Sequence, residues 1–396
     1  MPKFERVSKG NAGALLRQAI EAQQFLVPGK PRELKGNFSS ENTIFFEPEF
    51  DESLLAYEPE DQVITVSTGI TNGALRQILN SHKQFFPLAG SDDALVFELV
   101  SSGSDIFGDE RFGGLRSLAL GAQVLLSTGE VINCGGKVVK NVSGYDLTKL
   151  FIGSRCTLGI PLTVNLRLCT QSQSKAMVCL QGDDLAMIAK IINKTLLAAL
   201  PLTKLQVVDD RLIQKDQSCQ FSLTAQFEGS KQVLSELSDE LVALWRATLE
   251  QVSRANSFAI SVVSGDAKDH DQVNNGVNPY PVAHFANIEL VAARDVLFKL
   301  WEFCLSLDLE LYGHMQASAC RLKLYTGKRD TIQTLVQNLE TWAESEKQTF
   351  LAAYADDTYE YRVRKFPTDD EGSVRLKREL KQKFDPRNML NPLVLL

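Results

Sequence analysis

The sequence has no excess of positive charge, no paired-cysteine motif and few histidines. Lysine and arginine number 42 against 49 aspartate and glutamate residues, a net charge of -7, so no overall positive field attracts a nucleic-acid backbone. The seven cysteines are scattered and none stands in a C-x-x-C pair, which predicts reduced thiols rather than a zinc or iron-sulfur site. Four histidines leave little for a multi-histidine metal centre. We therefore expect no nucleic-acid partner and no metal site.

Long apolar runs and several common motifs are absent as well. No stretch reaches the roughly 18 apolar residues of a membrane-spanning helix, and the first residues lack the apolar core of a secretory signal. We expect a cytoplasmic protein without a transmembrane segment, one that meets a membrane only through its partners. The P-loop, the G-x-G-x-x-G fingerprint after a strand, H-E-x-x-H and G-x-S-x-G are all missing, which argues against the enzyme classes that depend on them.

The composition, 44% hydrophobic and 23% charged, is that of an ordinary globular protein, and 396 residues predict two or three domains. Over the first 170 residues strands, turns and helices alternate. Residues 12–24 and 72–82 have helical periodicity, 62–69 alternate as a strand does, and 118–136 indicate a hairpin across Thr128-Gly129. The polar run TQSQSK near residue 170 marks a linker.

Beyond the linker the pattern changes. A β-α-β-β-α-β order runs from residue 176 to 263 and recurs over 286–354. We expect an antiparallel sheet backed by helices, built as a tandem pair of ferredoxin-like units. A basic helix that ends before Pro386 follows.

The segment from Gly135 to Leu168 carries the densest signal. Ser143 is placed to cap a helix, and Asp146 completes a variant of the capping box. We expect Leu147, Leu150 and Phe151 of this helix to face a core.

At Gly153-Ser154 the helix stops, and Thr157-Leu158-Gly159-Ile160 turns into a strand. Glycines at 153 and 159 let backbone amides approach a pyrophosphate or a flat ring. The alternative is that both glycines serve only a tight helix-to-strand turn.

The run GGKVVKNVSGYDLTKLFIGSRCTLGI resembles the signature of the FAD-linked oxidases of the vanillyl-alcohol oxidase and p-cresol methylhydroxylase (PCMH) superfamily, most closely its glycolate oxidase FAD-binding accessory subunits. YEPEDQVITVSTGITNGALRQIL, LGAQVLLSTGEVI and FDPRNMLNPL are similar to further family segments. The resemblance covers residues 13–170 and the last dozen, and the middle only by element order.

The resemblance implies an α+β fold. Residues 1–170 would form a PCMH-type FAD-binding domain of two α+β subdomains, and 171–355 a ferredoxin-like antiparallel cap domain. Residues 356–396 would be a segment that returns to the FAD domain.

Carried over position by position, the resemblance places non-covalent FAD contacts in four stretches. These are Gly29, Lys30, Gly90, Ser91, Ser102, Gly103, Gly153, Ser154, Thr157, Leu158, Gly159 and Ile160. Two loops depart from the family pattern. The loop at 28–32 has two prolines and one glycine, and no histidine for a covalent flavin bond. The loop at 87–94 would place Asp92 and Asp93 beside the diphosphate, where like charges repel.

No pattern fixes a catalytic base. The candidates are His314, Arg321 and Tyr145, followed by His284, Lys323 and Lys140. Arg321 and Lys323 share one strand face, which would hold a carboxylate or form a solvated side.

The resemblance implies two-electron oxidation of a small 2-hydroxy acid within a complex, with electrons passed to a second flavoprotein subunit and an iron-sulfur subunit or to a quinone. The alternative is a non-catalytic scaffold subunit that has lost or weakened FAD binding; a third hypothesis is a stand-alone oxidase with oxygen as acceptor.

Overall fold

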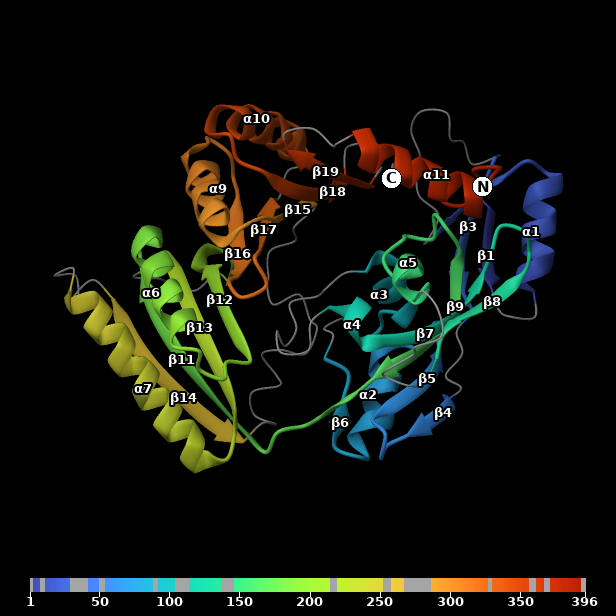
Figure 1. Ribbon diagram of the computed structural model, residues 1–396. Coiled ribbons are helices and arrows are strands. Elements are labelled where there is room, and N and C mark those ends of the chain that lie inside the picture. Colours follow the sequence, from blue (N-terminus) through green and yellow to red (C-terminus); the bar gives the residue numbers. More distant parts are fainter. Residues whose placement is uncertain are drawn as a thin grey trace.

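The computed structural model describes residues 3–7, 11–28, 42–49, 54–87, 92–103, 114–136, 146–213, 219–251, 258–266, 286–326, 330–355, 361–366 and 371–392. Within these ranges the chain forms two lobes (Figure 1).

An antiparallel five-stranded sheet organises the first lobe. Its strand order is β4 (Leu54–Glu58), β5 (Val63–Ser67), β9 (Ile160–Arg167), β7 (Ala119–Leu125) and β8 (Val131–Gly135). The helices of this lobe are α2 (Asn72–Asn80), α3 (Val96–Ser102), α4 (Leu115–Leu118) and α5 (Thr148–Phe151). Ile64, Val66 and Val164 form a core with Leu75 and Leu79 of α2. The side chain of Thr71 caps α2 by accepting the Ala74 N–H, so the helix begins where its polar N-cap stands.

A second, parallel sheet has the order β1 (Lys3–Val7), β3 (Thr43–Pro48) and β2 (Phe25–Pro28), with helix α1 (Ala12–Glu21) beside it. Its core includes Leu125 and Ile160 of the first sheet and Met389 and Leu390 near the C-terminus. Residues from both ends of the chain and from the signature therefore share one apolar cluster. The short strands β6 (Gln84–Phe85) and β10 (Cys169–Thr170) pair separately.

The second lobe is built on a nine-stranded sheet. In order, its strands are β14 (Ala259–Asp266), β11 (Ser174–Gly182), β13 (Phe221–Gly229), β12 (Lys204–Asp209), β16 (Tyr312–Gln316), β17 (Arg321–Thr326), β15 (Ala286–Val291), β18 (Phe350–Ala355) and β19 (Tyr361–Phe366). The first four strands and the next four repeat one ferredoxin-like arrangement, and β12 pairs with β16 to join the two units. This confirms the expected tandem cap. β19 lies beyond residue 355 and still pairs with β18; the domain boundaries stay a prediction.

Helices cover one face of this sheet, on the side away from the first lobe (Figure 1). They are α6 (Leu185–Leu197), α7 (Lys231–Glu250), α9 (Arg294–Ser306) and α10 (Asp330–Glu346); a 3-10 turn, η2 (Asp210–Ile213), follows β12. The apolar side chains of the strands point into this helix layer, where Trp245 and Trp301 are fully buried. The opposite, helix-free face carries the alternating polar positions and is turned toward the first lobe.

Helix α11 (Glu371–Phe384) lies along the first lobe (Figure 1), and Leu390 after it forms a bridge with Leu26 of β2. Leu26 of β2 donates its N–H to Met389 O at 2.8 Å, and Asn391 donates its N–H to Leu26 O at 2.7 Å. The segment is thus hydrogen-bonded to a strand almost the whole chain away.

The helix of the signature is shorter than the sequence predicts. α5 begins at Thr148, where the Asp146 carboxylate accepts the Thr148 N–H at 3.1 Å. Leu147 is 41% exposed, so the expectation that it faces a core is wrong, whereas Phe151 is buried. Ser143 lies outside the described residues.

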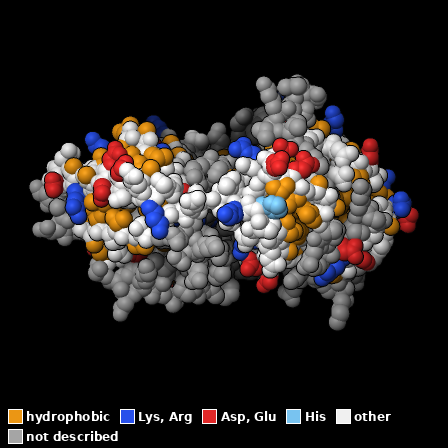
Figure 2. All heavy atoms as spheres, turned by 90° about the horizontal axis from the view of Figure 1, so that it is seen from below, with side chains coloured by type: hydrophobic (Ala, Val, Ile, Leu, Met, Phe, Trp, Pro, Cys, Tyr) orange, Lys and Arg blue, Asp and Glu red, His pale blue; other side chains and the backbone are white. Residues whose placement is uncertain are grey.

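Acidic and basic side chains are interspersed on the underside of both lobes rather than gathered into one large patch (Figure 2). Among the described residues no helix is both long and apolar enough to cross a bilayer. The seven cysteines are free thiols.

Candidate functional site

The signature bend, residues 153–160, begins where two glycines meet. Gly153 has a φ of +80° and Gly103, at the C-terminal end of α3, a φ of +60°. The Gly153 N–H donates to Val100 O at 3.0 Å, and the Arg155 N–H donates to Ser101 O at 2.7 Å. The structure therefore brings the predicted pair Ser102-Gly103 together with Gly153-Ser154.

The rest of the bend is buried. Leu158 and Ile160 pack into the lobe, and the Thr157 hydroxyl donates to Ser154 O at 2.6 Å. A Cβ on Gly159 would lie 2.5 Å from Val124 Cγ1 and 3.1 Å from a ring carbon of Phe151. Packing alone thus accounts for this glycine, as the tight-turn alternative expects. Whether these residues also contact a cofactor stays a prediction.

Two features of the bend point toward a ligand. The Ser154 hydroxyl is buried and has no hydrogen-bond partner among the described residues. Arg116 of α4 donates from Nε to Ile152 O at 3.2 Å, and its Nη2 lies 3.7 Å from where a Cβ on Gly153 would stand. The guanidinium keeps further donors beside the two glycines. Sequence reasoning missed Arg116, although it stands two residues after the glycine pair Gly113-Gly114.

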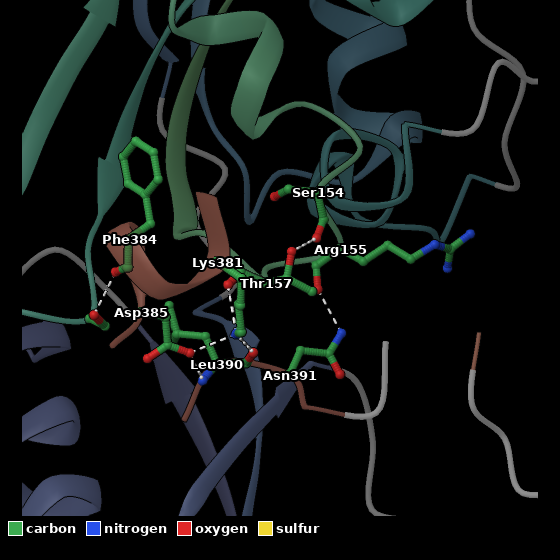
Figure 3. Close-up of polar contacts among 9 residues, drawn as sticks. Ser154, Arg155, Thr157, Lys381, Phe384, Asp385, Leu390 and Asn391 are labelled. Carbon is green, nitrogen blue, oxygen red and sulfur yellow. Dashed lines mark hydrogen bonds and ion pairs between the residues drawn. The ribbon is translucent and has the colours of Figure 1, made fainter. Parts of the chain in front are cut away.

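The C-terminal segment is hydrogen-bonded to the same bend (Figure 3). Lys381 Nζ donates to Thr157 O at 2.9 Å, and Asn391 Nδ2 donates to Arg155 O at 2.6 Å. The Arg155 side chain extends away from the segment. The sequence similarity of FDPRNMLNPL had marked this stretch, but not these two side chains as its contacts to the bend.

The loop at 87–94 is described only in part. Asp92 forms an ion pair with Arg76, and its carbonyl accepts the Gly73 N–H at 3.0 Å. Arg76 offsets the negative charge that the sequence placed beside a diphosphate. Seven predicted residues lie outside the described ranges: Gly29, Lys30, Gly90, Ser91, Lys140, Tyr145 and His284.

The helix-free face of the nine-stranded sheet gathers a second set of polar side chains. His314 on β16 stands opposite Lys323 of β17, and its Nε2 lies 3.3 Å from Gln206 Oε1 on β12. His314 is only 5% exposed. Burial, with smaller contributions from Lys323 and Lys204, lowers the pKa of His314 to about 3. The imidazole is therefore neutral near pH 7.

Arg321, the other predicted carboxylate holder, is engaged differently. Its Nη1 lies 3.1 Å from Glu289 Oε1, so an internal carboxylate already faces this guanidinium. Burial, and then the charge of Glu289, raises the pKa of Tyr325 on the same face. Lys323 and Lys204 thus place positive charge near His314, and Glu289, which faces Arg321, is also the cross-strand neighbour of Lys323. Among the described residues no group of His, Cys, Asp and Glu side chains is arranged to hold a metal ion.

No family model matches the chain. Similar proteins include glycolate oxidase subunit GlcD of Bacillus subtilis, 28% identical over 164 residues, which cover 39% of this chain and 34% of GlcD. A probable mitochondrial D-lactate dehydrogenase of Danio rerio is 22% identical over 86% of this chain and 73% of its own length. Glycolate oxidase subunit GlcE of Escherichia coli is 29% identical over 29% of this chain and 34% of GlcE. The aligned part thus spans about a third of the two glycolate oxidase subunits.

Solved structures match over nearly the whole chain. A 4-ethylphenol oxidase from Gulosibacter chungangensis superposes with a TM-score of 0.69 at 13% identity, covering 98% of this chain and 88% of the oxidase. A carbohydrate oxidase from Microdochium nivale gives a TM-score of 0.67 at 10% identity, covering 99% and 91%. The two lobes, the tandem cap and these superpositions confirm the resemblance stated from the sequence: the chain has the α+β fold of the vanillyl-alcohol oxidase and p-cresol methylhydroxylase superfamily, and its sequence relatives are FAD-linked oxidases and dehydrogenases.

Proposed function

We propose that the chain is an FAD-dependent oxidoreductase that binds FAD non-covalently and oxidises a small 2-hydroxy acid. Its relatives are named for glycolate, D-lactate and D-2-hydroxyglutarate, and all three compounds carry a hydroxyl next to a carboxylate. Further relatives are named FAD-linked oxidoreductases.

The observation that carries the proposal is the buried Ser154 hydroxyl, which has no hydrogen-bond partner among the described residues and follows Gly153 at the point where the main chains of Gly103 and Gly153 are in contact. A buried polar group costs about 1–3 kcal/mol when nothing pairs with it, so an acceptor such as a phosphate oxygen is the expected occupant. Arg116 supplies positive charge at the same place. These residues fit the diphosphate of FAD, with Gly103, Gly153, Ser154 and Arg116 as its holders.

Bound FAD supplies a two-electron acceptor for the substrate C–H bond. The chain's own part is to hold and orient the 2-hydroxy acid. Lys323 and Lys204 on the helix-free face are suited to a carboxylate, because both lie close enough to His314 for their positive charges to lower its pKa. A carboxylate bound there offsets the lysine charges and so raises the pKa of His314. His314 then becomes a better proton acceptor only when substrate is present.

We further propose that the chain works in a complex. Two relatives are named as subunits of glycolate oxidase, and the sequence has no cysteine pattern for an iron-sulfur cluster of its own. A second flavoprotein subunit and an iron-sulfur subunit would receive the electrons.

The test starts from purified protein. Flavin absorption near about 370 and 450 nm at one FAD per chain is expected. Under anaerobic conditions glycolate, D-lactate and D-2-hydroxyglutarate should then be tried, with L-lactate, L-2-hydroxyglutarate and the matching acids without the 2-hydroxyl group as controls. Bleaching by a 2-hydroxy acid supports the proposal. Colourless protein that takes up no added FAD contradicts it and favours the scaffold alternative.

A further inference from the structure

Lys381 joins three separate pieces of chain at one buried point. Its ammonium donates to Thr157 O in the signature bend at 2.9 Å, to Asp385 Oδ2 one helical turn on at 2.6 Å, and to Leu390 O at 2.6 Å. An ammonium has three N–H donors, and all three are used. Burial lowers the pKa of Lys381, while the Asp385 carboxylate acts in the opposite direction. A buried cation is stable only where such acceptors are in place, so the three pieces depend on one another.

Asp385 fixes the turn that follows α11. Besides the ammonium, its Oδ2 accepts the Leu390 N–H at 2.7 Å. The carboxylate is 1% exposed. The hydrogen bond from Leu390 to Asp385 therefore closes the turn over residues 385–390 and places Leu390 O where it accepts from Lys381.

Asn391 makes the second link to the bend. Its Nδ2 donates to Arg155 O at 2.6 Å, and its backbone N–H donates to Leu26 O at 2.7 Å. Two carbonyls of the bend, those of Arg155 and Thr157, thus accept hydrogen bonds from side chains of the C-terminal segment. Cys156, which lies between them, is buried.

Phe384 links the same segment to the helix before the bend. Its ring meets the Phe151 ring edge to face, with centroids 5.5 Å apart, and its carbonyl accepts from Ser127 Oγ at 2.7 Å. Residues 381–391 therefore contact both Phe151 of α5 and the Arg155 and Thr157 carbonyls of the bend. The arrangement leaves the Ser154 hydroxyl unpartnered among the described residues rather than capped by the segment.

We propose that Lys381 and Asn391 are positioning residues that hold the signature bend in the shape that binds FAD, so that docking of the C-terminal segment and cofactor occupancy are thermodynamically coupled. The inference rests on the proposed FAD site. Coupling is reciprocal: loosening the segment weakens FAD binding, and FAD slows opening of the segment.

The decisive variants remove a donor with little change of shape. Lys381→Met keeps the alkyl chain but loses the ammonium. Asn391→Asp is isosteric and loses the donor to Arg155 O; it also tolerates the positive φ of 41° at this position. Lys383→Met, on the exposed side of the same helix, is the matched control. FAD dissociation constants are measured by flavin fluorescence titration on cofactor-free protein whose folding is checked by circular dichroism, and amide hydrogen exchange is followed at residues 153–160 and 385–391.

At least a tenfold rise in the FAD dissociation constant is expected for Lys381→Met and Asn391→Asp, with faster exchange of the Arg155 and Thr157 amides and no change for Lys383→Met. In the wild type, FAD should slow exchange at Leu390 and Asn391. Dissociation constants within twofold of the wild type in folded Lys381→Met or Asn391→Asp overturn the inference. Should Lys381→Met fail to fold, Asn391→Asp decides.

Failure of the proposed function looks different. A wild-type chain that takes up no FAD overturns the cofactor site itself and, with it, the coupling. The exchange rates then still show whether the segment holds the bend: faster exchange in both variants keeps that structural link, and equal rates remove it.

Discussion

Gly103 and Gly153 meet main chain to main chain: a Cβ added to Gly103 would lie 2.5 Å from the Gly153 Cα. Both residues have positive φ values, which glycine adopts without strain. A side chain at either position would also come too close to the backbone of the other residue. Helix α3 and the signature bend are in contact there without any side chain between them. This contact brings together two predicted FAD-binding stretches that are fifty residues apart in the chain.

Gly103→Ala should destabilise the protein by about 1–3 kcal/mol, because the new methyl group clashes with Gly153 in addition to straining the backbone. Gly129→Ala is the matched control. Gly129 also has a positive φ, +87°, but nothing lies within 4 Å of its would-be Cβ, so the control reports strain alone. Urea unfolding of the cofactor-free proteins measures both costs. If Gly103→Ala and Gly129→Ala lower the free energy of unfolding equally, the contact between Gly103 and Gly153 contributes nothing to stability.

Gly159→Ala should also lower the free energy of unfolding by about 1–3 kcal/mol, because the added methyl group overlaps Val124. Gly229→Ala, where nothing lies within 4 Å, is the control and should change stability little. Thermal unfolding distinguishes the two. Loss of FAD in a Gly159 variant therefore says little about cofactor contact unless folding is shown to be intact. A Gly159→Ala protein as stable as the wild type would contradict the packing role.

Ser154→Ala separates cofactor binding from folding. Removing a buried hydroxyl that has no partner among the described residues should leave the free energy of unfolding of cofactor-free protein unchanged or raise it by up to about 1 kcal/mol. The same change should weaken FAD binding about tenfold, since a hydrogen bond to a charged phosphate is lost. Ser117→Ala, at an exposed position of α4, controls for the substitution itself. An unchanged FAD dissociation constant would remove Ser154 from the site.

The cap was predictable because its information is local and repeated. Strand β13 alternates apolar and polar residues, β11 is largely apolar, and the longer helices between the strands fix the β-α-β-β-α-β order. The pairing of β12 with β16, which joins the two units, depends on contacts distant in sequence and could not be read from periodicity.

In the signature, by contrast, the sequence did not predict where the helix begins. Helical spacing predicted a helix capped by Ser143, but the helix begins only at Thr148, whose N–H donates to the Asp146 carboxylate. A side chain that competes for a backbone N–H ends a periodic pattern early. Lys381 and Asn391 were likewise beyond prediction, because a lysine on a basic helix looks the same whether it faces water or a buried carbonyl.

His314 should give the protein an acid-labile component of stability. Its pKa in the folded protein is about 3, below the ordinary value of 6.5, chiefly through burial and then through Lys323 and Lys204. Between these two values the unfolded chain binds a proton that the folded chain does not, so stability rises with pH, by up to about 1.4 kcal/mol per pH unit. Below about pH 3 and above 6.5 the contribution is flat.

His314→Gln, neutral at every pH, should remove that slope. The measurement is denaturant unfolding between pH 4 and 7, with the exposed His82→Gln as control. If the wild type and His314→Gln lose stability in parallel on acidification, His314 is not the group responsible.

Lys323→Met should raise KM for the 2-hydroxy acid about tenfold or more, because a lysine near the buried His314 is lost from the place proposed for the substrate carboxylate. The change also removes a positive charge that lowers the pKa of His314, so the acidic limb of the pH–rate profile should move to higher pH. Lys299→Met, on the exposed side of α9, is the control and should leave both unchanged. Steady-state kinetics with an artificial electron acceptor across pH 5 to 9 checks the two effects together. If the KM and the pH profile both match those of the control, the helix-free face does not hold the substrate. If the KM rises but the acidic limb stays at the same pH, Lys323 remains the partner of the carboxylate and His314 is excluded as the proton acceptor.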